Sequence, residues 1–498
     1  MNTGAPWMTP QEAKSRVLHH QRKLHRWATA DKDKRFCDLW NLVCDPATIQ
    51  EAWTRVRANR GAATAGVDAW TRRNVAHHIG EDRFLIELRE ALRSRAFRPL
   101  PVREWGIPKK GGKIRYLGIP ALRDRVVQMA LKLMLEPIFE SDFYDSSYGY
   151  RPGRRAHDAI AEIVHLGNTP ALYEWVIEAD IEACFDHIDH RMLMSEIERR
   201  IGDRRVLALI RAFLKAGVMT EAGRFERRLT GTPQGGIISP LLANVALNVL
   251  DQEFEARWPK TQGQRHWQRR KGFATYRLIR YADDFVVMVK GTNAQAEMVM
   301  AELPNVLKPI GLTLSPDKTR LAHIDDGFEF LGFRIVRKPR GNAKPCVYTF
   351  VSDEALASIK RKVKALTKSD RTSLTLTELI WALNPVLRGW AAYFHHAAAK
   401  QTFSYVRYYT WWRVARWLCR KHAHTNWKEL CRRYNLPGQP TEGIVLYDVG
   451  AVRVTRYRYR GSKIPTPWNE VESKVMMPSP SDDDIDFLGR LEERLVGR

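Results

Sequence analysis

Two adjacent carboxylates, Asp283 and Asp284, interrupt an apolar run that reads RYADDFVVMV over residues 280–289. The flanking residues are mostly β-branched or aromatic, which is typical of strands, and a strand interior is an unfavourable place for paired negative charge. The pair therefore lies either in a solvated turn between two strands or in a turn that holds a metal ion. Because short strings of this kind also arise by chance, YADD alone does not choose between the two.

A third carboxylate, Asp180, lies in EADIEACFDHIDH (178–190), at the end of an apolar stretch. A buried acid is unfavourable there unless it is paired or bound to a metal. If all three aspartates end or turn strands of one antiparallel sheet, they meet at one edge. Such hard oxygen ligands suit magnesium, and two ions could serve an in-line displacement at a primer 3′-hydroxyl. His187 and His190 are expected to be structural, since no further His or Cys has metal-ligand spacing.

The elements that must position these aspartates read as a mixture of strands and helices. Strands are expected where β-branched and aromatic residues gather or alternate with polar ones, at residues 173–181, 274–280, 285–290 and 452–460, and in a hairpin over 100–120. Helices are expected from apolar spacing and loop signals over residues 1–95, with a glycine-rich interruption at 59–71, over 121–137 and 190–215, after TGTPQGG, and beyond 355.

The charge of the chain points to a polyanionic partner. The 498 residues contain 81 Lys and Arg against 56 Asp and Glu, a net charge of +25. Residues 351–470 alone carry 21 Lys and Arg against 8 Asp and Glu. A generally basic protein without such a partner is the alternative. Sixteen Trp and sixteen Tyr, many beside arginines, favour nucleic acid, because aromatic rings and guanidinium planes stack on bases.

The remaining composition indicates a cytoplasmic protein. The six cysteines form no C-x-x-C pair, so neither a zinc ribbon nor a disulfide framework is indicated, and reduced thiols are expected. The N-terminal residues lack the apolar core of a signal peptide. No run approaches the roughly 18 apolar residues of a membrane span, so no membrane partner is expected.

The motifs, taken together, resemble those of the reverse transcriptases. Asp180 with Phe185, TPQGGIISP (232–240), YADD, GLTLSPDKT (311–319) and FLGF (330–333) occur in the order and spacing of that class. Four further motifs resemble the group II intron-encoded reverse transcriptase/maturases: NRGAATAGVD (59–68), IPKKGGKIRYLGIPALRDRVVQ (107–128), SYGYRPGRRAHDAI (147–160) and LNPVLRGWAAYF (383–394). The similarity extends from about residue 35 to 435.

This resemblance implies an α+β fold of the right-hand polymerase type. Fingers and palm would be built on antiparallel sheet and followed by an α-helical thumb, the maturase domain. The implied domains are an N-terminal helical extension with the template-capping segment (1–95), fingers and palm (96–345), thumb (355–435), and a C-terminal region with a basic strand and an acidic flexible tail (436–498).

The resemblance also assigns roles around the active site. Asp180, Asp283 and Asp284 would be the catalytic residues and the ligands of two Mg²⁺ ions. Phe185 would lie beneath the sugar and exclude a ribonucleotide 2′-hydroxyl, although a lone phenylalanine is more often a core residue. The other implied nucleotide-binding residues are Lys109, Lys113 and Arg115 in the fingers hairpin and Gln234, flanked by Gly235 and Gly236. Lys318 is expected to complete the palm fold, with a direct catalytic part as the alternative.

Contacts with template, primer or intron RNA are implied in three regions. The members of this set, drawn from the capping segment, the SYGYRPGRR motif and the start of the thumb, are Asn59, Thr64, Gly66, Arg151, Arg388, Trp390 and Tyr393. Trp411, Trp412 and Trp417 have helical spacing and are expected to be mostly core, with stacking on nucleic acid as the alternative.

Two departures from the family pattern concern the C-terminus. Many relatives carry an H-N-H nuclease with metal-binding cysteines and histidines, yet no Cys or His follows Cys431. The extension over 436–498 could contact DNA or RNA through its YRYRG sequence, or pack against the thumb.

The function implied is an RNA-directed DNA polymerase that binds group II intron RNA, assists its splicing and copies it during intron mobility, with dNTPs and a DNA target or primer as further partners. The alternatives are a domesticated relative in DNA repair or defence, and an RNA-binding splicing factor without a polymerase role.

Overall fold

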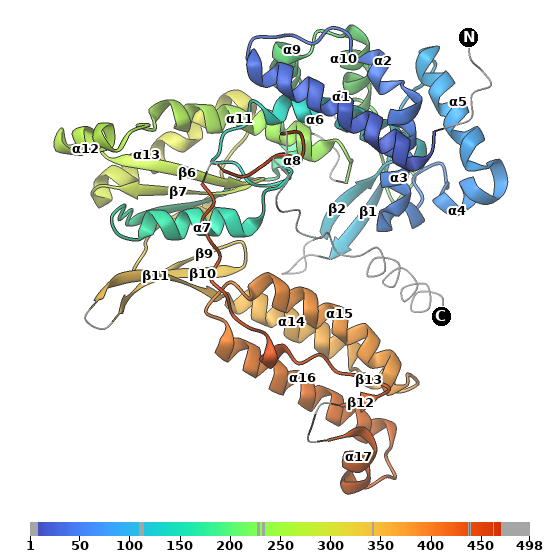
Figure 1. The fold of residues 1–498 in the computed structure, drawn as a ribbon, viewed down its shortest axis with the longest axis vertical. Helices are drawn as coiled ribbons and strands as arrows, with labels where there is room; N and C mark the ends of the chain where they lie inside the picture. Colours follow the sequence, from blue (N-terminus) through green and yellow to red (C-terminus); the bar gives the residue numbers. More distant parts are fainter. Residues whose placement is uncertain are drawn as a thin grey trace.

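The computed structural model describes residues 8–108, 114–226, 230–231, 235–340, 343–436, 438, 440–461 and 463–469. N-terminal helices and a fingers hairpin lie at one end, a four-stranded palm sheet lies in the middle, and a helical thumb extends from the other end (Figure 1). This is the expected α+β right-hand polymerase fold, which the structure confirms.

The N-terminal region is helical, as predicted. Its principal helices α1 and α3 begin at side-chain caps: Thr9 and Glu12 form a capping box, and Asp45 accepts from the backbone of Ala47 ahead of α3. Both helices pack against the long helix α6. The helices are α1 (Pro10–Ala30), α2 (Trp40–Val43), α3 (Pro46–Ala58), α4 (Arg72–Asn74), α5 (Glu81–Arg93) and α6 (Leu122–Glu140).

Helix α6 continues past the proline at which it was expected to end. Pro137 cannot donate to the carbonyl of Leu133, which would be left without a partner in a buried helix. The buried side chain of Gln21 on α1 donates to that carbonyl at 2.8 Å. A long-range hydrogen bond therefore compensates for the proline, and the expected end at residue 137 is wrong.

The fingers sheet is a hairpin extended by two short strands. The predicted hairpin is confirmed: β1 (Val102–Pro108) pairs antiparallel with β2 (Ile114–Ile119). Strand β4 (Val218–Met219) then pairs parallel with β1, and β5 (Phe225–Glu226) pairs with β4. The fingers sheet is mixed and not purely antiparallel as expected, because β4 reaches β1 only after the chain has crossed the palm.

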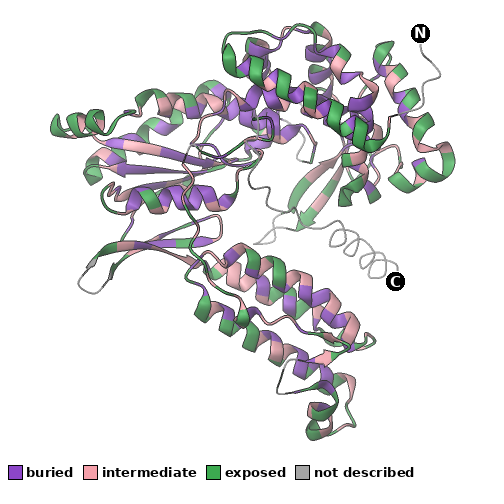
Figure 2. Ribbon diagram, in the orientation of Figure 1, coloured by how far each residue is buried: buried purple, intermediate pink, exposed green. Residues whose placement is uncertain are grey.

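The palm sheet is antiparallel throughout, in the order β6-β7-β3-β8. Alternate residues of its strands face opposite sides: Ile177 and Val287 join a core with α6 and α11, while Val176 and Val286 join a core that includes α7 and the thumb. The purple strands between the two layers of helices in Figure 2 show this burial. The strands are β3 (Trp175–Asp180), β6 (Thr275–Tyr281), β7 (Asp284–Lys290) and β8 (Arg320–His323).

Helices cover both faces of the palm sheet. The helices of this part of the chain are α7 (Ala156–Gly167), α8 (Cys184–His187), α9 (His190–Arg200), α10 (Arg204–Leu214), α11 (Ser239–Arg257), α12 (Gln262–Arg270) and α13 (Asn293–Leu307). The single helix expected over 190–215 is two helices, because Asp203 caps α10 and its carboxylate also accepts from the backbone of Leu39 and Trp40.

A three-stranded sheet leads from the palm into the helical thumb. Its strands are β9 (Phe328–Phe330), β10 (Phe333–Arg340) and β11 (Ala343–Val351). The thumb helices are α14 (Asp353–Leu366), α15 (Leu376–Phe394), α16 (Lys400–Lys421) and α17 (Trp427–Tyr434), followed by the short strands β12 (Thr441–Glu442) and β13 (Ile444–Val445). Helices beyond residue 355 were expected and are confirmed.

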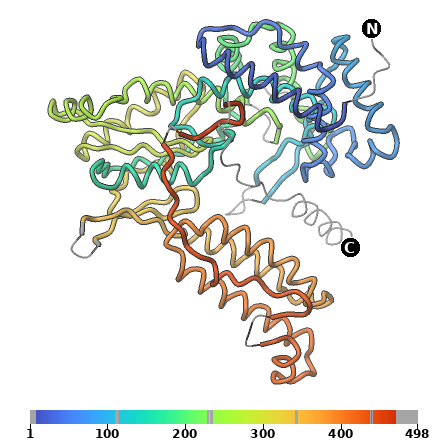
Figure 3. Tube along the Cα trace, in the orientation of Figure 1, coloured from blue at the N-terminus to red at the C-terminus, as the bar shows by residue number. Residues whose placement is uncertain are grey.

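The strand expected over residues 452–460 is not formed. This segment and the residues after it, 452–461 and 463–469, form an extended strap that pairs with no strand of the described chain. The strap runs from the thumb across α7 toward α1 (Figure 3). The alternation that suggested a strand is real, because Tyr457 and Tyr459 are half-buried while Arg456 and Arg458 are exposed, but the rings pack on helix α7.

Two further findings bear on the sequence expectations. All six cysteines are free thiols. Within the described ranges, no helix combines the length and the apolar character needed to cross a membrane.

Candidate active site

The Asp283–Asp284 pair lies at a tight turn between β6 and β7. Tyr281 pairs with Asp284, so only Ala282 and Asp283 form the turn, and Ala282 has a φ of +60°. This left-handed conformation is uncommon for a residue with a Cβ, and it persists only where the surroundings hold it. Gly149 supplies part of that support: a Cβ at this glycine would lie 2.3 Å from the Ala282 nitrogen.

The structure brings Asp180 to the same edge of the palm sheet. Asp180 is the last residue of β3 and stands directly opposite Asp284 in the antiparallel register. Asp283 follows from the adjoining turn, so three carboxylates from sequence positions about a hundred residues apart converge. Like charges placed opposite one another on neighbouring strands repel, so this arrangement needs a positive partner.

The crowding of these carboxylates shows in their acidity. Desolvation, followed by the negative charges of Asp283 and Asp180, raises the pKa of Asp284 to about 7. The pKa of Asp283 is also raised, first by desolvation, while the charge of Arg115 on β2 acts in the opposite direction. A cation that binds at this edge would favour the ionised forms of both groups.

Lys318 is the cationic side chain that contacts the cluster. Its ammonium lies 2.6 Å from Asp180 Oδ2. The loop that carries it is fixed to the end of β3, because the Ser315 N–H donates to the Asp180 carbonyl at 2.9 Å. The side chain expected to complete the palm fold therefore also reaches the carboxylates.

The donor set fits a divalent metal, although it is not arranged as a preformed cage. In the described part of the chain, no group of three or more His, Cys, Asp or Glu side chains is placed to hold a metal ion. Lys318 contacts Asp180, and a hydrogen bond joins Asp180 to Asp284. Carboxylate oxygens that repel one another and already hold an ammonium are the chemistry that Mg²⁺ prefers.

A buried arginine beneath the turn was missed by the sequence reasoning. The side chain of Arg280 is fully buried, and it forms a two-point ion pair with the equally buried Asp251 of α11. It also donates to the Ala282 carbonyl at 2.9 Å and to Asn244 Oδ1 at 2.9 Å. Arg280 therefore ties the catalytic turn to helix α11. A charged residue in an apolar strand was the available signal, because a buried charge requires partners.

The predicted nucleotide-binding residues lie around this edge where they are described. Phe185 is buried on α8, five residues beyond Asp180. Arg115 lies on the exposed strand β2. Gly235 has a φ of +115°, and a Cβ there would lie 2.6 Å from the Gly118 carbonyl of the same strand. Lys109, Lys113 and Gln234 lie outside the described residues.

The capping segment contains both exposed and structural residues. Asn59 and Thr64 are exposed, whereas Gly66 is buried so closely that a Cβ would lie 2.6 Å from the Ala121 Cα. Arg125, which the sequence reasoning did not single out, donates to the Gly61 carbonyl at 2.5 Å and to the Thr64 carbonyl at 2.7 Å. Gly66 therefore packs closely against the Ala121 backbone, and its contact with template stays a prediction.

Three residues predicted to contact RNA form hydrogen bonds within the protein. Arg151 is buried, pairs with Glu140 at 2.8 Å and donates to the backbone carbonyls of Tyr144 and Ser147. Trp390 donates to a backbone carbonyl at 3.2 Å and packs within the thumb core, and Tyr393 donates to the Leu331 carbonyl at 3.0 Å. Their polar atoms are used in holding the fold. Arg388 differs, because it is exposed and lies over the Tyr447 ring.

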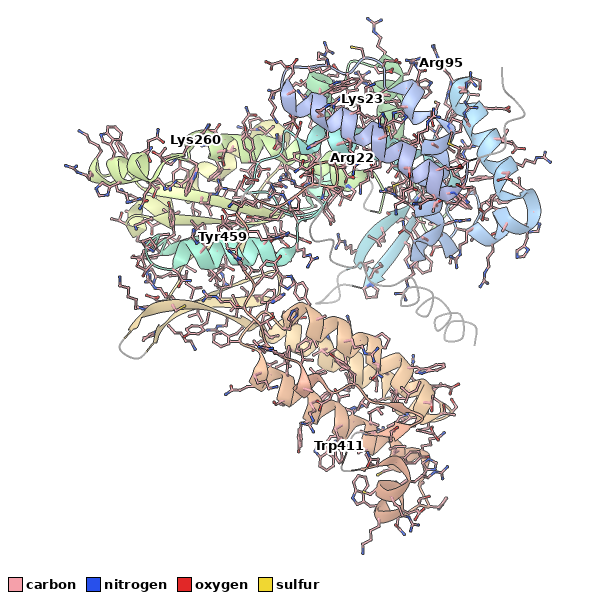
Figure 4. All side chains as sticks on the ribbon, viewed as in Figure 1. Arg22, Lys23, Arg95, Lys260, Trp411 and Tyr459 are labelled. Carbon is pink, nitrogen blue, oxygen red and sulfur yellow. The ribbon has the colours of Figure 1, made fainter. Side chains whose placement is uncertain are left out.

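One face of helix α16 exposes aromatic and basic side chains. Tyr405, Tyr408, Trp412 and Arg416 recur at helical spacing and are all exposed. The Arg416 guanidinium lies over the Trp412 ring, 6.0 Å from its centre. Trp417 is fully buried, as expected. The aromatic side chains of this lower helix are visible around Trp411 in Figure 4.

Comparison with known proteins agrees with this architecture. Residues 107–335 match the reverse transcriptase (RNA-dependent DNA polymerase) family, and residues 356–435 match the group II intron maturase-specific domain. Protein YkfC of Escherichia coli K12 is 38% identical over 374 residues, which cover 70% of this chain and 96% of YkfC.

Two more distant likenesses involve named proteins. The group II intron-encoded protein LtrA of Lactococcus lactis is 28% identical over 519 residues, which cover 90% of this chain and 84% of LtrA. A solved telomerase of Candida albicans has a TM-score of 0.35 and 14% identity, covering 68% of this chain and 61% of that one.

The fold and the match to the reverse transcriptase family define a reverse transcriptase, an RNA-directed DNA polymerase of a class that depends on divalent metal. More particularly, the chain belongs to the group II intron-encoded reverse transcriptase/maturase family, and its helical thumb is the maturase domain that binds RNA. The family expected from the motifs is confirmed.

Proposed function

We propose that this chain binds a group II intron RNA, assists its splicing and copies it into DNA during intron mobility. The observation that carries the proposal is the meeting of Asp180, Asp283 and Asp284 at one edge of the palm sheet. This edge lies on the same side of the molecule as the fingers hairpin and thumb (Figure 1). We place this activity in the cytoplasm.

The three aspartates would hold two Mg²⁺ ions. When bound, the ions would activate the primer 3′-hydroxyl and stabilise the leaving pyrophosphate. The chain itself supplies the geometry: Arg280 fixes the turn that carries Asp283, and the β3–β7 register places Asp180 opposite Asp284. Lys318 holds the Asp180 carboxylate beside them and balances its charge.

The incoming dNTP would lie between this edge and strand β2. Arg115, with Lys109 and Lys113 of the same hairpin, would neutralise the triphosphate. Phe185 would exclude a ribonucleotide by collision with its 2′-hydroxyl, and Gln234 would support the nucleotide and the templating base.

RNA would be held by the fingers and by the thumb. Asn59 and Thr64 present exposed side chains on the capping segment. On the thumb, Arg388 and the exposed face of α16 offer guanidinium groups and aromatic rings, which bind phosphates and stack on bases. A protein that binds the folded intron more tightly than its unfolded ensemble shifts the RNA toward the folded state, and this would assist splicing without protein catalysis.

The proposal is tested by Asp283→Asn combined with Asp284→Asn. We expect primer extension on poly(rA)/oligo(dT) with Mg²⁺ to be abolished, while affinity for the intron RNA stays within a few-fold. The neighbouring pair Asp325→Asn with Asp326→Asn is the matched control, because both residues are exposed and lie at the far end of β8 from the catalytic turn. cDNA synthesis by the catalytic double variant would refute the assignment, and no extension by the wild type would favour an RNA-binding splicing factor.

A further inference from the structure

A cavity of about 900 Å³ lies between the palm, the thumb and the strap. Helix α7, strand β11, residues 396–398 and strap residues 454–459 line it. Its lining shares no residue with the carboxylate edge or the nucleotide-binding set. The volume falls within the range of about 300–1,000 Å³ that is usual for ligand sites.

Aromatic rings form the side of the cavity that the strap provides. The Tyr457 ring stacks on His157 with centres 5.4 Å apart, and Tyr459 stacks on His165 at 4.6 Å. Tyr459 lies over α7 in Figure 4. The Tyr348 side chain of β11 lines the cavity as well. Rings at several points of one cavity offer flat surfaces to bases, a feature of single-strand binding sites.

The cavity is also basic. Lys344 of β11 and Arg456 and Arg458 of the strap line it, and all three are exposed. In the described structure, these three side chains have no hydrogen bond or ion pair. The lining contains no aspartate or glutamate. Three unpaired cations without a carboxylate create a positive potential that attracts phosphates.

The acidic residues of helix α7 that lie beside the cavity-lining residues in sequence already pair with arginines. Asp158 accepts from Arg460 at 2.6 and 2.8 Å, and Glu162 pairs with Arg277 at 3.0 Å. These ion pairs anchor the strap and the helix, and they leave the lysine and the two arginines of the cavity free for a ligand.

We propose that this cavity binds a single-stranded segment of RNA, with phosphates on Lys344, Arg456 and Arg458 and a base against the aromatic rings. This inference rests on the proposed function, because it takes the RNA in the cavity to be part of the intron RNA that the enzyme binds. An acidic peptide would use the cations but has no flat base to lie against the aromatic rings that line the cavity. The site holds RNA away from the polymerase edge, so RNA can be bound there while primer and template are engaged.

The test uses the full-length protein saturated with an unlabelled (rA)/(dT) hybrid duplex whose two strands have equal length, so that the polymerase cleft is filled and no single-stranded RNA is added. Fluorescein-labelled oligo(rC) is then titrated and followed by fluorescence anisotropy, with oligo(dC) in parallel. The variant is Lys344→Gln with Arg456→Gln. The matched control is Arg334→Gln with Arg453→Gln, which removes one exposed cation from the same sheet and one from the strap, neither lining the cavity.

We expect the saturated wild type to bind oligo(rC), the cavity variant to bind it about tenfold more weakly, and the control to match the wild type. The slope of log affinity against log salt should fall by about 1.4 in the cavity variant, since each phosphate contact on a single strand contributes about 0.7. No binding by the saturated enzyme, equal losses in both variants, or tighter binding of oligo(dC) would overturn the inference. Primer extension on poly(rA)/oligo(dT) is measured separately for every protein: its loss in the wild type would count against the proposed function, whereas its retention together with unchanged oligo(rC) binding by the cavity variant would count against the cavity alone.

Discussion

At the scale of single residues, the edge of the palm sheet gathers three carboxylates, and no single cationic side chain neutralises all of them. Asp180 and Asp284 face each other across two strands, and burial, followed by the charges of Asp283 and Asp180, raises the pKa of Asp284 to about 7. The Lys318 ammonium, which contacts Asp180, offsets part of this repulsion in the protein alone. A divalent metal could take its place, because the fold, and not the carboxylates themselves, keeps the three acids together at this edge.

The closeness of Gly149 to the catalytic turn leads to a residue-scale prediction. Gly149→Ala would place a Cβ 2.3 Å from the Ala282 nitrogen, so the turn must move. Because displacement of about 1 Å can reduce a rate roughly a hundredfold, we expect primer extension to fall at least tenfold with little change in the far-UV circular dichroism spectrum. Gly263→Ala on the remote helix α12, where the nearest atom is 4.0 Å away, should extend primers normally. Full activity in Gly149→Ala would show that the turn tolerates displacement.

Asp124 provides a prediction on pH. Burial raises its pKa to about 6, although its carboxylate accepts from the Leu100 N–H at 2.8 Å. Between about pH 4 and pH 6 the unfolded chain has lost this proton while the folded chain keeps it, so the free energy of unfolding falls as the pH rises, by up to about 3 kcal/mol. Asp124→Asn should remove this part of the pH dependence in thermal unfolding. An unchanged profile would contradict it.

The role of a residue could be predicted from the sequence where its side chain is chemically unusual for its position. It could not be predicted where the role depends on which residues pack together in the fold. The three aspartates stood out because carboxylates are rare in apolar strands, and they converge as expected. Arg280 stood in the same decapeptide but had no nameable partner, since Asp251 becomes its neighbour only when α11 packs under the sheet. The pairing of Arg151 with Glu140 could not be predicted for the same reason, because it depends on the fold.

At the scale of elements, periodicity identified the helices and strands but not which face each one exposes. The expectation of helices dense in Trp, Tyr and Arg was correct for α16, yet the sequence did not separate the buried Trp417 from the exposed Trp412. For the strap, the alternation of buried and exposed side chains was predicted correctly, but the strand was not. Its aromatic side chains pack on helix α7 and not on a neighbouring strand. Partners far along the chain decide both cases.

The exposed face of α16 supports an element-scale prediction. Tyr408 and Trp412 are 62% and 39% exposed and stand one turn apart. If bases stack there, Tyr408→Ala with Trp412→Ala should weaken intron-RNA binding by about 1–3 kcal/mol per stacked base while primer extension on a simple homopolymer is largely kept. The matched control is Trp267→Ala with Phe273→Ala, two exposed aromatics in and beside α12 on the palm. Filter-binding assays that give equal affinities for both double variants would exclude α16 as the RNA face.

At the scale of the whole molecule, the strap joins parts that the chain builds far apart. Its Thr455 N–H donates to the thumb at His395, Arg460 binds Asp158 of the palm helix α7, and the Trp468 ring lies 5.4 Å from His25 on α1. Thumb, palm and N-terminal helices are thereby connected on one side of the molecule (Figure 3). Composition predicted a basic segment here, but its course could not be predicted, because it depends on three surfaces formed by other elements.

The contact of the strap with the palm helix α7 predicts how processivity should respond to Arg460→Gln. The variant leaves the carboxylate of Asp158, which is only 2% exposed, without its cation, and we expect a loss of roughly 2 kcal/mol in the free energy of unfolding. The larger effect should be on the length of the cDNA products, since a thumb that is less firmly bound to the palm releases primer–template sooner. Single-nucleotide addition should be nearly unchanged while long cDNA products become rarer.

Arg453→Gln is the control, because it removes an exposed charge from the same strap without breaking the contact with Asp158. Product lengths measured with a trap for released enzyme separate the two variants. If both give wild-type lengths, the strap does not hold the thumb during synthesis. If Arg460→Gln instead abolishes the first addition, the ion pair supports the active edge itself, and the coupling runs through the palm sheet.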